Sequence, residues 1–400
     1  MSSLGLRLSV RREDFPHSHE ISELRVSAGR LRTLLEKHGV DKLVEELTEI
    51  LGKASLPLGR HDLTEGQVRG FAQNLRGYTR HPWTTMQNYD LNLVRRSSCF
   101  GPPYLFDGRP HLLRYNPKKE YYLVDRFTDA FTEDVRLRAR RALTPLSPLE
   151  RWNDPDERRV IVRHAIQNFG TIHSHTLRES IFATGKEAST FKETLALSVF
   201  RLLRSRRILD FSAGWGARLA AAIVHGADRY VGCDPNQSLK RGHEELADFL
   251  GSAPGVVRIH YQPFEDVDLR EERFDTVFSS PPYFDVECYE EENSGQSINR
   301  HPTMQGWIRD WLFPTLAKSW RHLVEGGCLA VHMCDTRFIE PMLLYIGSRL
   351  PGATYRGVLS CTGSQSKPRP IWVFEKRSIA RPEIEDLLPT LYPELKVEPL

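Results

Sequence analysis

The fold is decided by the stretch from Ile208 to Arg218, which reads ILDFSAGWGAR. Its first residues are apolar, as in a buried strand, and they lead into a loop where Gly214 and Gly216 are separated by one residue. A helical pattern begins directly afterwards. Glycine lets the backbone come close to a ligand because it has no Cβ, and the free N–H groups at the start of a helix suit a carboxylate. The stretch therefore predicts a ligand-binding turn between a strand and a helix.

Strand and helix patterns alternate on both sides of this turn. Helical patterns occur at 156–168, 192–203, 217–226, 238–250, 307–323 and 341–350. Strand patterns occur at 206–211, 229–234, 257–261, 274–280, 328–333 and 369–376, with a glycine turn predicted at 325–327. Strands that alternate with helices of this length predict an α/β fold, with a mostly parallel, Rossmann-like sheet covered by helices on both faces.

The N-terminal part has a different texture. Residues 17–54 carry apolar positions at three- and four-residue steps, which predicts helices that stop at Gly39 and Gly52. Residues 77–125 are rich in aromatic residues, proline and glycine, which predicts loops and short strands. An arginine-rich helical stretch follows at 129–150.

These changes predict three parts of the chain. Residues 1–150 form a mainly helical and irregular N-terminal domain, a candidate for substrate recognition; 151–378 form the α/β domain; 379–400 form a peripheral tail punctuated by prolines. The arginines within 134–163 suit either a basic stripe that contacts nucleic acid or a solvated helical face, and both interpretations stay open.

Composition limits the class of protein. The chain has 400 residues, a net charge of +3 and 40% hydrophobic residues, as expected for a globular protein. No apolar run is long enough to span a bilayer and no secretory signal is evident, so we expect no membrane association and a cytoplasmic location, or a nuclear one in a eukaryote. The mild positive charge permits a nucleic-acid partner without arguing for one. The six cysteines form no CxxC pair, which favours reduced thiols without a zinc site.

Acidic residues follow the next two strands. Asp234 ends the strand after the glycine loop, the place where nucleotide-type α/β folds bind ribose hydroxyls. Glu265 and Asp266 come after the third strand, where a carboxylate could meet an adenine amine. An alternative role for Asp234 is that of a helix N-cap before Pro235. A complete GxGxxG motif is missing, which disfavours NAD as the ligand.

A candidate catalytic motif, Ser280-Pro281-Pro282-Tyr283, ends the fourth strand of the series. An exocyclic base amine is a poor nucleophile because its lone pair is delocalised into the ring. Hydrogen-bond acceptors at Ser280 and at the Pro281 carbonyl would localise that lone pair, the prolines would stiffen the backbone, and Tyr283 would stack on a base. The alternative is a rigid turn, since Pro-Pro-Tyr also occurs at 102–104 without a glycine loop before it.

Together these residues resemble the amino-methyltransferases, the group that includes DNA adenine-N6 and cytosine-N4 methyltransferases. The resemblance covers about 180–376 and implies a class I methyltransferase sheet, S-adenosyl-L-methionine as cofactor and DNA as partner. The catalytic residues that it implies are Ser280, Pro281, Pro282 and Tyr283. The cofactor-binding residues that it implies are Phe191, Lys192, Asp210, Phe211, Ser212, Ala213, Gly214, Gly216, Asp234, Pro235, Glu265 and Asp266.

Two departures from this family affect the substrate. The first motif position is Ser280 rather than Asp or Asn, which favours cytosine-N4 over adenine-N6. No long recognition insertion follows the motif, so target reading would come from 1–150 or from the polar loop 287–302. That loop is either a lid over the substrate or a surface excursion.

Other substrates and roles stay open. An RNA base or a protein glutamine could be the acceptor, although Ser280 counts against glutamine, and a catalytically silent partner subunit would keep the same fold. His173 and His175 form an HxH pair that could bind metal on one strand face. With no third ligand evident, we interpret them as solvated or packed and expect no metal. The sequence does not predict the oligomeric state.

Overall fold

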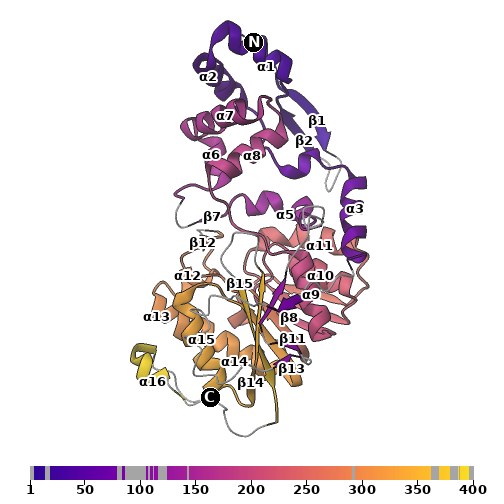
Figure 1. Ribbon diagram of the computed structural model, residues 1–400, viewed down its shortest axis with the longest axis vertical. Helices are drawn as coiled ribbons and strands as arrows, with labels where there is room; N and C mark the ends of the chain where they lie inside the picture. The colour runs from indigo at the N-terminus through magenta and orange to yellow at the C-terminus, as the bar shows by residue number, and fades with distance from the viewer. Residues whose placement is uncertain are drawn as a thin grey trace. The chain divides into compact units, whose positions relative to one another are not determined.

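The computed structural model describes residues 4–13, 19–78, 83–85, 105–106, 109–110, 112–115, 124–141, 144–290, 293–361, 369–378, 386 and 388–395 (Figure 1). The chain forms two compact units. The first comprises Met1–Gln73, Arg126–Thr190 and Val286–Glu291, and the second comprises Asn74–Asp125, Phe191–Asp285 and Glu292–Leu400. The predicted division near residue 150 falls inside the first unit, because helices on both sides of that point share one apolar core.

The first unit is mainly helical. Its strands are β1 (Ser9–Glu13), β2 (His19–Glu23), β7 (Arg140–Arg141) and β12 (Glu287–Cys288). Its helices are α1 (Ala28–His38), α2 (Val40–Leu51), η1 (Gly59–Asp62), α5 (Asp129–Arg136), α6 (Pro148–Asn153), α7 (Pro155–Phe169) and α8 (Ser174–Thr184), and α3 (Glu65–Arg76) spans the unit boundary. Leu43, Leu47, Trp152 and Ile161 are fully or almost fully buried in its core.

The prediction for residues 17–54 is confirmed in part. Helices α1 and α2 end at Gly39 and Gly52 as expected. Residues 19–23 were expected to be helical, and that expectation is wrong, since they form β2 and pair antiparallel with β1. Ile21 is buried between two more exposed neighbours, which is the alternation of a strand rather than of a helix.

The arginines of 134–163 form neither a single stripe nor a single solvated face. Arg136 is buried and lies 2.8 Å from Asp129 and 3.2 Å from Glu187. Arg158 is also buried and donates to the carbonyl oxygen of Thr48. Arg159 and other members stay at the surface. Several of these guanidinium groups therefore hold the first unit together.

The second unit contains a sheet of nine strands. These are β3 (Trp83–Thr85), β6 (Leu112–Tyr115), β8 (Arg207–Asp210), β9 (Arg229–Cys233), β10 (Val257–His260), β11 (Phe274–Ser279), β13 (Leu323–His332), β14 (Ala353–Cys361) and β15 (Arg369–Lys376). Their order is β10-β9-β8-β11-β13-β15-β14-β6-β3. The first five are mutually parallel, whereas β15 is antiparallel to both β13 and β14. The predicted Rossmann-like, mostly parallel sheet is confirmed.

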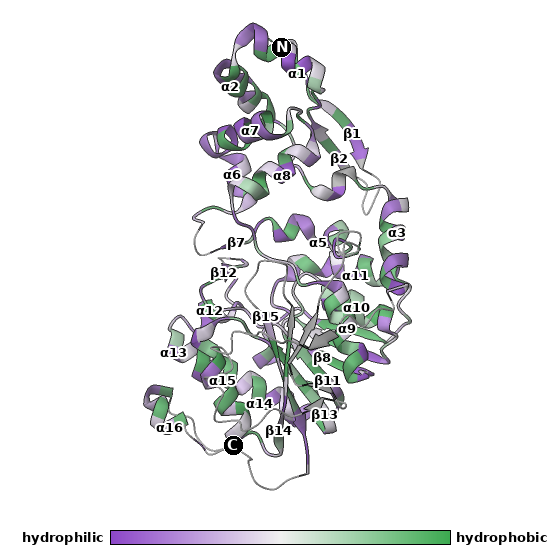
Figure 2. Ribbon diagram, viewed as in Figure 1, coloured by the Kyte–Doolittle hydropathy of each residue, from purple (hydrophilic) through white to green (hydrophobic). Residues whose placement is uncertain are grey.

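Helices cover both faces of this sheet. Figure 1 shows α9 (Glu193–Leu203), α10 (Ala217–His225) and α11 (Lys240–Phe249) on one side, and α14 (Phe313–His322) and α15 (Thr336–Arg349) on the other. The shorter helices are η4 (Gln237–Leu239), η5 (Phe264–Asp266), α12 (Ser297–Arg300), α13 (Met304–Gly306), the π-helix η6 (Trp307–Leu312), α16 (Leu388–Leu391) and η7 (Pro393–Leu395). Hydrophobic residues predominate along the central strands (Figure 2) and are buried, as expected for a parallel sheet between two helical layers.

Two strands differ from their predictions. The sequence patterns did not indicate β14, because Arg356 and Gly357 interrupt its apolar residues. The glycine turn predicted at 325–327 lies within β13. Phe274 of β11 pairs with Leu323, but Thr276 pairs with Cys328, so β13 bulges between these two pairs. A short ribbon of β4 (Leu105–Phe106) and β5 (Arg109–Pro110) completes the strands.

Candidate active site

Asp210 anchors the glycine loop at the end of β8. Its carboxylate is fully buried and accepts hydrogen bonds from Arg218 Nε at 2.7 Å, from Tyr230 Oη at 2.9 Å and from Ser279 Oγ at 2.8 Å. Burial alone would lower the pKa of Arg218, but the Asp210 carboxylate outweighs it and the pKa is raised. The carboxylate thereby joins β8 to β9, α10 and β11.

The glycine loop itself requires glycine at two positions. Gly214 and Gly216 have φ values of +57° and +94°, in the region that other residues rarely adopt. Gly216 directly precedes α10, so the predicted strand–loop–helix arrangement is confirmed. Phe211 and Ala213 of the loop are buried, whereas Ser212 is partly exposed.

Asp234 holds the same loop from the end of β9. Its Oδ2 accepts from the Gly214 N–H at 2.9 Å and its Oδ1 accepts from the Asn236 N–H at 2.9 Å. Burial raises the pKa of Asp234 to about 6. The alternative N-cap role belongs to Asn236, whose side chain caps η4. Asp234 thus lies at the end of β9 and directly contacts the glycine loop.

His243 is a loop contact that the sequence patterns did not indicate. Its Nε2 lies 2.9 Å from the Gly214 carbonyl oxygen, and its Nδ1 lies 3.2 Å from Tyr261 Oη. Burial lowers the pKa of His243 to about 4, so the ring is neutral near pH 7. A neutral ring that donates from Nε2 can accept from the tyrosine at Nδ1. One feature of the sequence could have indicated this contact: His243 is a histidine within the helix predicted at 238–250.

The acids after β10 contact the segment that follows the catalytic motif. Arg300 contacts Asp266 with two nitrogens, at 2.9 and 3.2 Å. Glu265 Oε1 lies 3.5 Å from Arg300 Nη1 and 3.6 Å from His301 Nε2. Lys318 donates to the backbone carbonyls of this turn and so holds it in place. Both predicted adenine-side acids therefore have cationic neighbours.

We call residues 293–301 the covering segment. Asn293 Nδ2 donates to the Pro235 carbonyl oxygen at 3.0 Å. Gly295 lies so close to Pro235 that an added Cβ would be 3.0 Å from the proline Cβ. With the Arg300 contact to Asp266, this part of the polar loop lies against both acidic turns. The first part of the loop forms β12, whose Glu287 pairs with Arg141.

The catalytic motif begins directly after β11. Ser280 Oγ lies 2.9 Å from His332 Nδ1, and Tyr283 Oη lies 3.0 Å from the same nitrogen. Pro281 is buried and Pro282 is partly buried. The following residue, Phe284, has a φ of +50°, a conformation that costs a non-glycine residue roughly 1–2 kcal/mol. The motif is held tightly by its surroundings.

His332 and Phe191 complete the wall behind the motif. His332 ends β13, and burial lowers its pKa to about 3. The ring of Phe191 packs edge-on against His332 and Phe278, and Arg218 Cζ lies 5.1 Å from its centroid. The predicted residue Phe191 therefore joins the glycine-loop side of the site to the motif side.

Lys192 precedes α9 beside an acid from a distant part of the sequence. Asp125 accepts from the Thr194 N–H at 2.8 Å and from its hydroxyl at 2.9 Å. Burial raises the pKa of Asp125 to about 6, although the nearby Lys192 charge opposes this shift. No motif in the sequence indicated Asp125, because it lies in an aromatic and proline-rich region.

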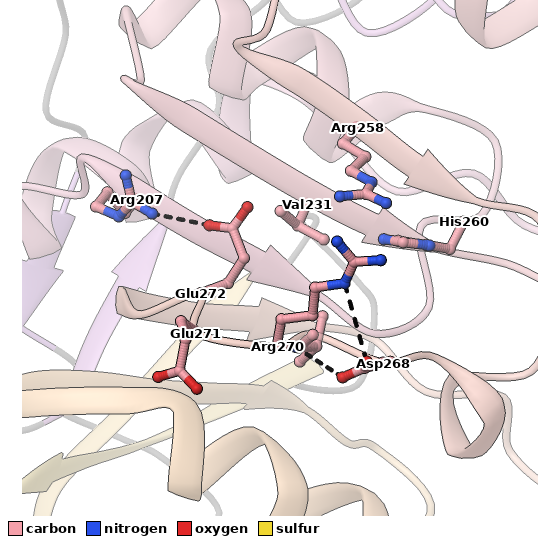
Figure 3. A pocket seen from close by; sticks show the side chains of 9 residues that line it. Arg207, Val231, Arg258, His260, Asp268, Arg270, Glu271 and Glu272 are labelled. Carbon is pink, nitrogen blue, oxygen red and sulfur yellow. Dashed lines mark hydrogen bonds and ion pairs between the residues drawn. The ribbon is translucent and has the colours of Figure 1, made fainter.

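A separate hollow lies beside the start of β8. Figure 3 shows Arg207, Arg258, His260 and Arg270 around a cavity of about 270 Å³, together with three acidic residues, Asp268, Glu271 and Glu272. Arg207 Nη2 lies 2.8 Å from Glu272 Oε2. Groups of both charges line this hollow, and none of the predicted site residues is among them.

The HxH pair is not on a strand, which corrects our expectation. His173 is the N-cap residue of α8 and His175 lies in its first turn, with the two rings stacked at 6.2 Å. Among the residues that the structure describes, no group of three or more potential ligands is arranged to hold a metal ion. Within the same residues, no helix combines the length and apolarity needed to cross a membrane.

Comparisons with known proteins give distant similarities. No family model matches the sequence, and no curated protein matches it. TrmN from Thermus thermophilus is 18% identical over 47% of this chain and 50% of its own, with a TM-score of 0.33. An rRNA methylase from Streptococcus thermophilus is 13% identical over 48% and 100% of the two chains, with a TM-score of 0.34. The O-methyltransferase TomG from Streptomyces achromogenes, solved with SAM, is 14% identical over 49% and 85%, with a TM-score of 0.34.

Proposed function

We propose that this chain is an S-adenosylmethionine-dependent N-methyltransferase that acts on the exocyclic amine of a nucleic-acid base. The favoured substrate is DNA, at cytosine-N4 or adenine-N6. One observation carries the proposal: the motif at Ser280 and the glycine loop at Gly214 follow β11 and β8, which are adjacent parallel strands. Ligands of open α/β sheets bind at the edge where such strands end.

The residues at this edge suit the proposed cofactor. The Asp234 carboxylate accepts two backbone N–H groups and keeps lone pairs for ribose hydroxyls. The backbone near Gly214 and Gly216 has no Cβ to block a ligand. Glu265 or Asp266 would meet the adenine amine after rearrangement of Arg300, and Phe191 and Lys192 would lie at the methionine end. The cofactor would supply a methyl group already activated on a sulfonium.

The motif suits an amine acceptor. Ser280 Oγ and the Pro281 carbonyl would accept hydrogen bonds from the NH2 group and so localise the nitrogen lone pair. The partly buried Tyr283 ring would stack on the base, worth about 1–3 kcal/mol. Positioning and preorganised hydrogen bonds would then account for the rate. In duplex DNA the base must first leave the stack, which costs a few kcal/mol.

Methyl transfer from radiolabelled S-adenosylmethionine to DNA, RNA and total protein tests the proposal. Nucleoside mass spectrometry should find N4-methylcytosine or N6-methyladenine in DNA. Ser280→Ala should abolish the label while leaving cofactor affinity within about threefold, whereas Asp234→Ala should weaken cofactor binding.

Each other outcome identifies an alternative. Label in RNA bases alone would make RNA the substrate, and label in protein alone would indicate a protein substrate. Tight cofactor binding with no label in any acceptor would indicate a silent partner subunit and overturn the proposal.

A further inference from the structure

We propose that His332 is a positioning residue that takes up the hydroxyl proton of Ser280, so that Ser280 presents its lone pairs to the amine and relays away the proton that the methylated amine releases. This inference rests on the proposed function. It stands on the 2.9 Å distance between Ser280 Oγ and His332 Nδ1, two side chains at the ends of the adjacent strands β11 and β13.

A serine at this place has a problem that a carboxylate or an amide carbonyl does not have. Its hydroxyl carries a proton, and a hydroxyl that points its proton toward an NH2 group cannot accept from that group. A fixed acceptor on the opposite side solves the problem, because the O–H then points away from the substrate. His332 Nδ1 is placed to be that acceptor.

The neighbours of His332 favour the required tautomer. Its Nε2 lies 3.3 Å from Cys334 Sγ, a weak acceptor to which an Nε2–H can donate. Tyr283 Oη lies 3.0 Å from Nδ1 and 3.3 Å from the His332 carbonyl oxygen, and we assign the tyrosine proton to the carbonyl oxygen. With the Nε2 proton and the tyrosine proton so placed, the Nδ1 lone pair is left for Ser280.

Methyl transfer and the proton transfer that follows it need no further reactant. The nitrogen lone pair forms the new N–CH3 bond, and the electrons of the broken S–CH3 bond return to sulfur. The methylated nitrogen now has one proton too many. That proton passes to Ser280 Oγ as the serine proton passes to His332 Nδ1, and it returns through Ser280 to water after the product leaves.

The surroundings of His332 oppose lasting protonation, so a proton that the ring takes up is released again. Burial and the positive charges of Arg369 and Arg218 lower its pKa, so the ring is neutral at the start of each cycle. A methylated amine that still carries both hydrogens is a far stronger acid than an imidazolium, because its charge cannot spread into the ring. The histidine can therefore accept the proton and release it again.

His332→Asn tests the inference. The asparagine amide oxygen can accept from Ser280 near the position of Nδ1, but it cannot become protonated at neutral pH. We expect kcat for methyl transfer to fall about 100-fold or more, as is typical for loss of an acid–base group, with KM for both substrates within about threefold. His322→Asn is the matched control, since His322 bonds to the Glu272 carbonyl oxygen away from the motif and should keep wild-type kcat.

The outcomes separate the two proposals. If wild-type protein labels no base, the proposed function fails and this inference falls with it. If the wild type labels a base and folded His332→Asn protein is equally active, only the inference on His332 is overturned. If His332→Asn does not fold, His332→Gln takes its place; its longer side chain also cannot take up the proton, so kcat should fall at least as much, with folding checked by thermal unfolding and cofactor binding.

Discussion

Asp234 connects the chemistry of a single carboxylate to the shape of the glycine loop. The carboxylate accepts from the Gly214 N–H, and its partial burial raises its pKa to about 6. A ribose hydroxyl can donate to the ionised group but gains much less from the protonated one. The ionisation state of this residue should therefore govern cofactor affinity.

We predict that affinity for S-adenosylmethionine falls as the pH drops below about 6, by roughly tenfold between pH 7 and pH 5. Titration calorimetry at three pH values measures this, and Asp234→Asn should flatten the dependence. The same raised pKa affects the stability of the fold in the opposite direction to cofactor affinity, because stability is greater at low pH. Because the pKa in the folded chain lies above the ordinary value of 3.8, the contribution of Asp234 to stability is present below about pH 4 and lost as the pH rises through about 6. A wild-type affinity that does not change with pH would contradict the ribose assignment.

Arg218 and Asp210 are the second residue-level test. Both side chains are buried, and their closest atoms lie 2.7 Å apart. Arg218→Met leaves an uncompensated carboxylate in the core, so we expect the free energy of unfolding to fall by about 3–5 kcal/mol in urea titrations. The control is Arg206→Met, which removes an ion pair to Asp228 that is exposed on both sides and should cost less than about 1 kcal/mol. Equal losses in the two variants would argue against the anchoring role of Asp210.

At the level of elements, the covering segment 293–301 is the part of the site most open to change. It contacts the acidic turns after β9 and β10 through Asn293 and Arg300. The Arg300–Asp266 pair is partly exposed, with 33% and 52% of the side-chain surfaces accessible. An ion pair so exposed contributes little to global stability, yet it can decide whether the segment stays against the turn.

We predict that Arg300→Ala raises hydrogen exchange across 293–301 and changes the dissociation rate of S-adenosylmethionine, with less than about 1 kcal/mol lost in global stability. Hydrogen-exchange mass spectrometry and stopped-flow chase experiments measure the two effects. Arg309→Ala is the matched control, because Arg309 pairs with its neighbour Asp310 outside the segment. Unchanged exchange in Arg300→Ala would favour the surface-excursion interpretation of the loop.

At the level of the whole molecule, the chain forms two units, and each unit is made of segments that alternate along the sequence. The predicted site residues from Phe191 to Tyr283 all belong to the second unit. Residues 286–291, which follow the motif, belong to the first unit, and the residues after them belong to the second. A role for the N-terminal residues in substrate recognition stays a prediction.

We predict that S-adenosylmethionine protects the second unit more than the first. At 100 times its Kd, a ligand that binds only the folded state stabilises it by about 2.7 kcal/mol. Hydrogen exchange with and without the cofactor should therefore slow mainly within 191–285 and 293–361. Protection concentrated in the first unit would contradict the placement of the cofactor site.

Local patterns predicted much of the second unit and less of the site. The strand RPIWVFEK and the turn ILDFSAGWG have the predicted form, because hydrophobic period and glycine placement are local properties. The strand β14 was missed where Arg356 and Gly357 break the period. The supporting residues Asp125, His243 and His332 were missed because each gains its role from a partner distant in the sequence or on another element.

The sequence by itself determined the alternation of strands and helices, the glycine loop, and a Ser-Pro-Pro-Tyr motif at the end of a strand. Only the tertiary structure decided that β11 lies between β8 and β13. That order places Ser280 beside His332 and anchors Ser279 to Asp210. The physical reason is that strand order depends on which strands pair and which helices cover them, and these contacts join residues far apart in the chain whose local patterns do not specify one another.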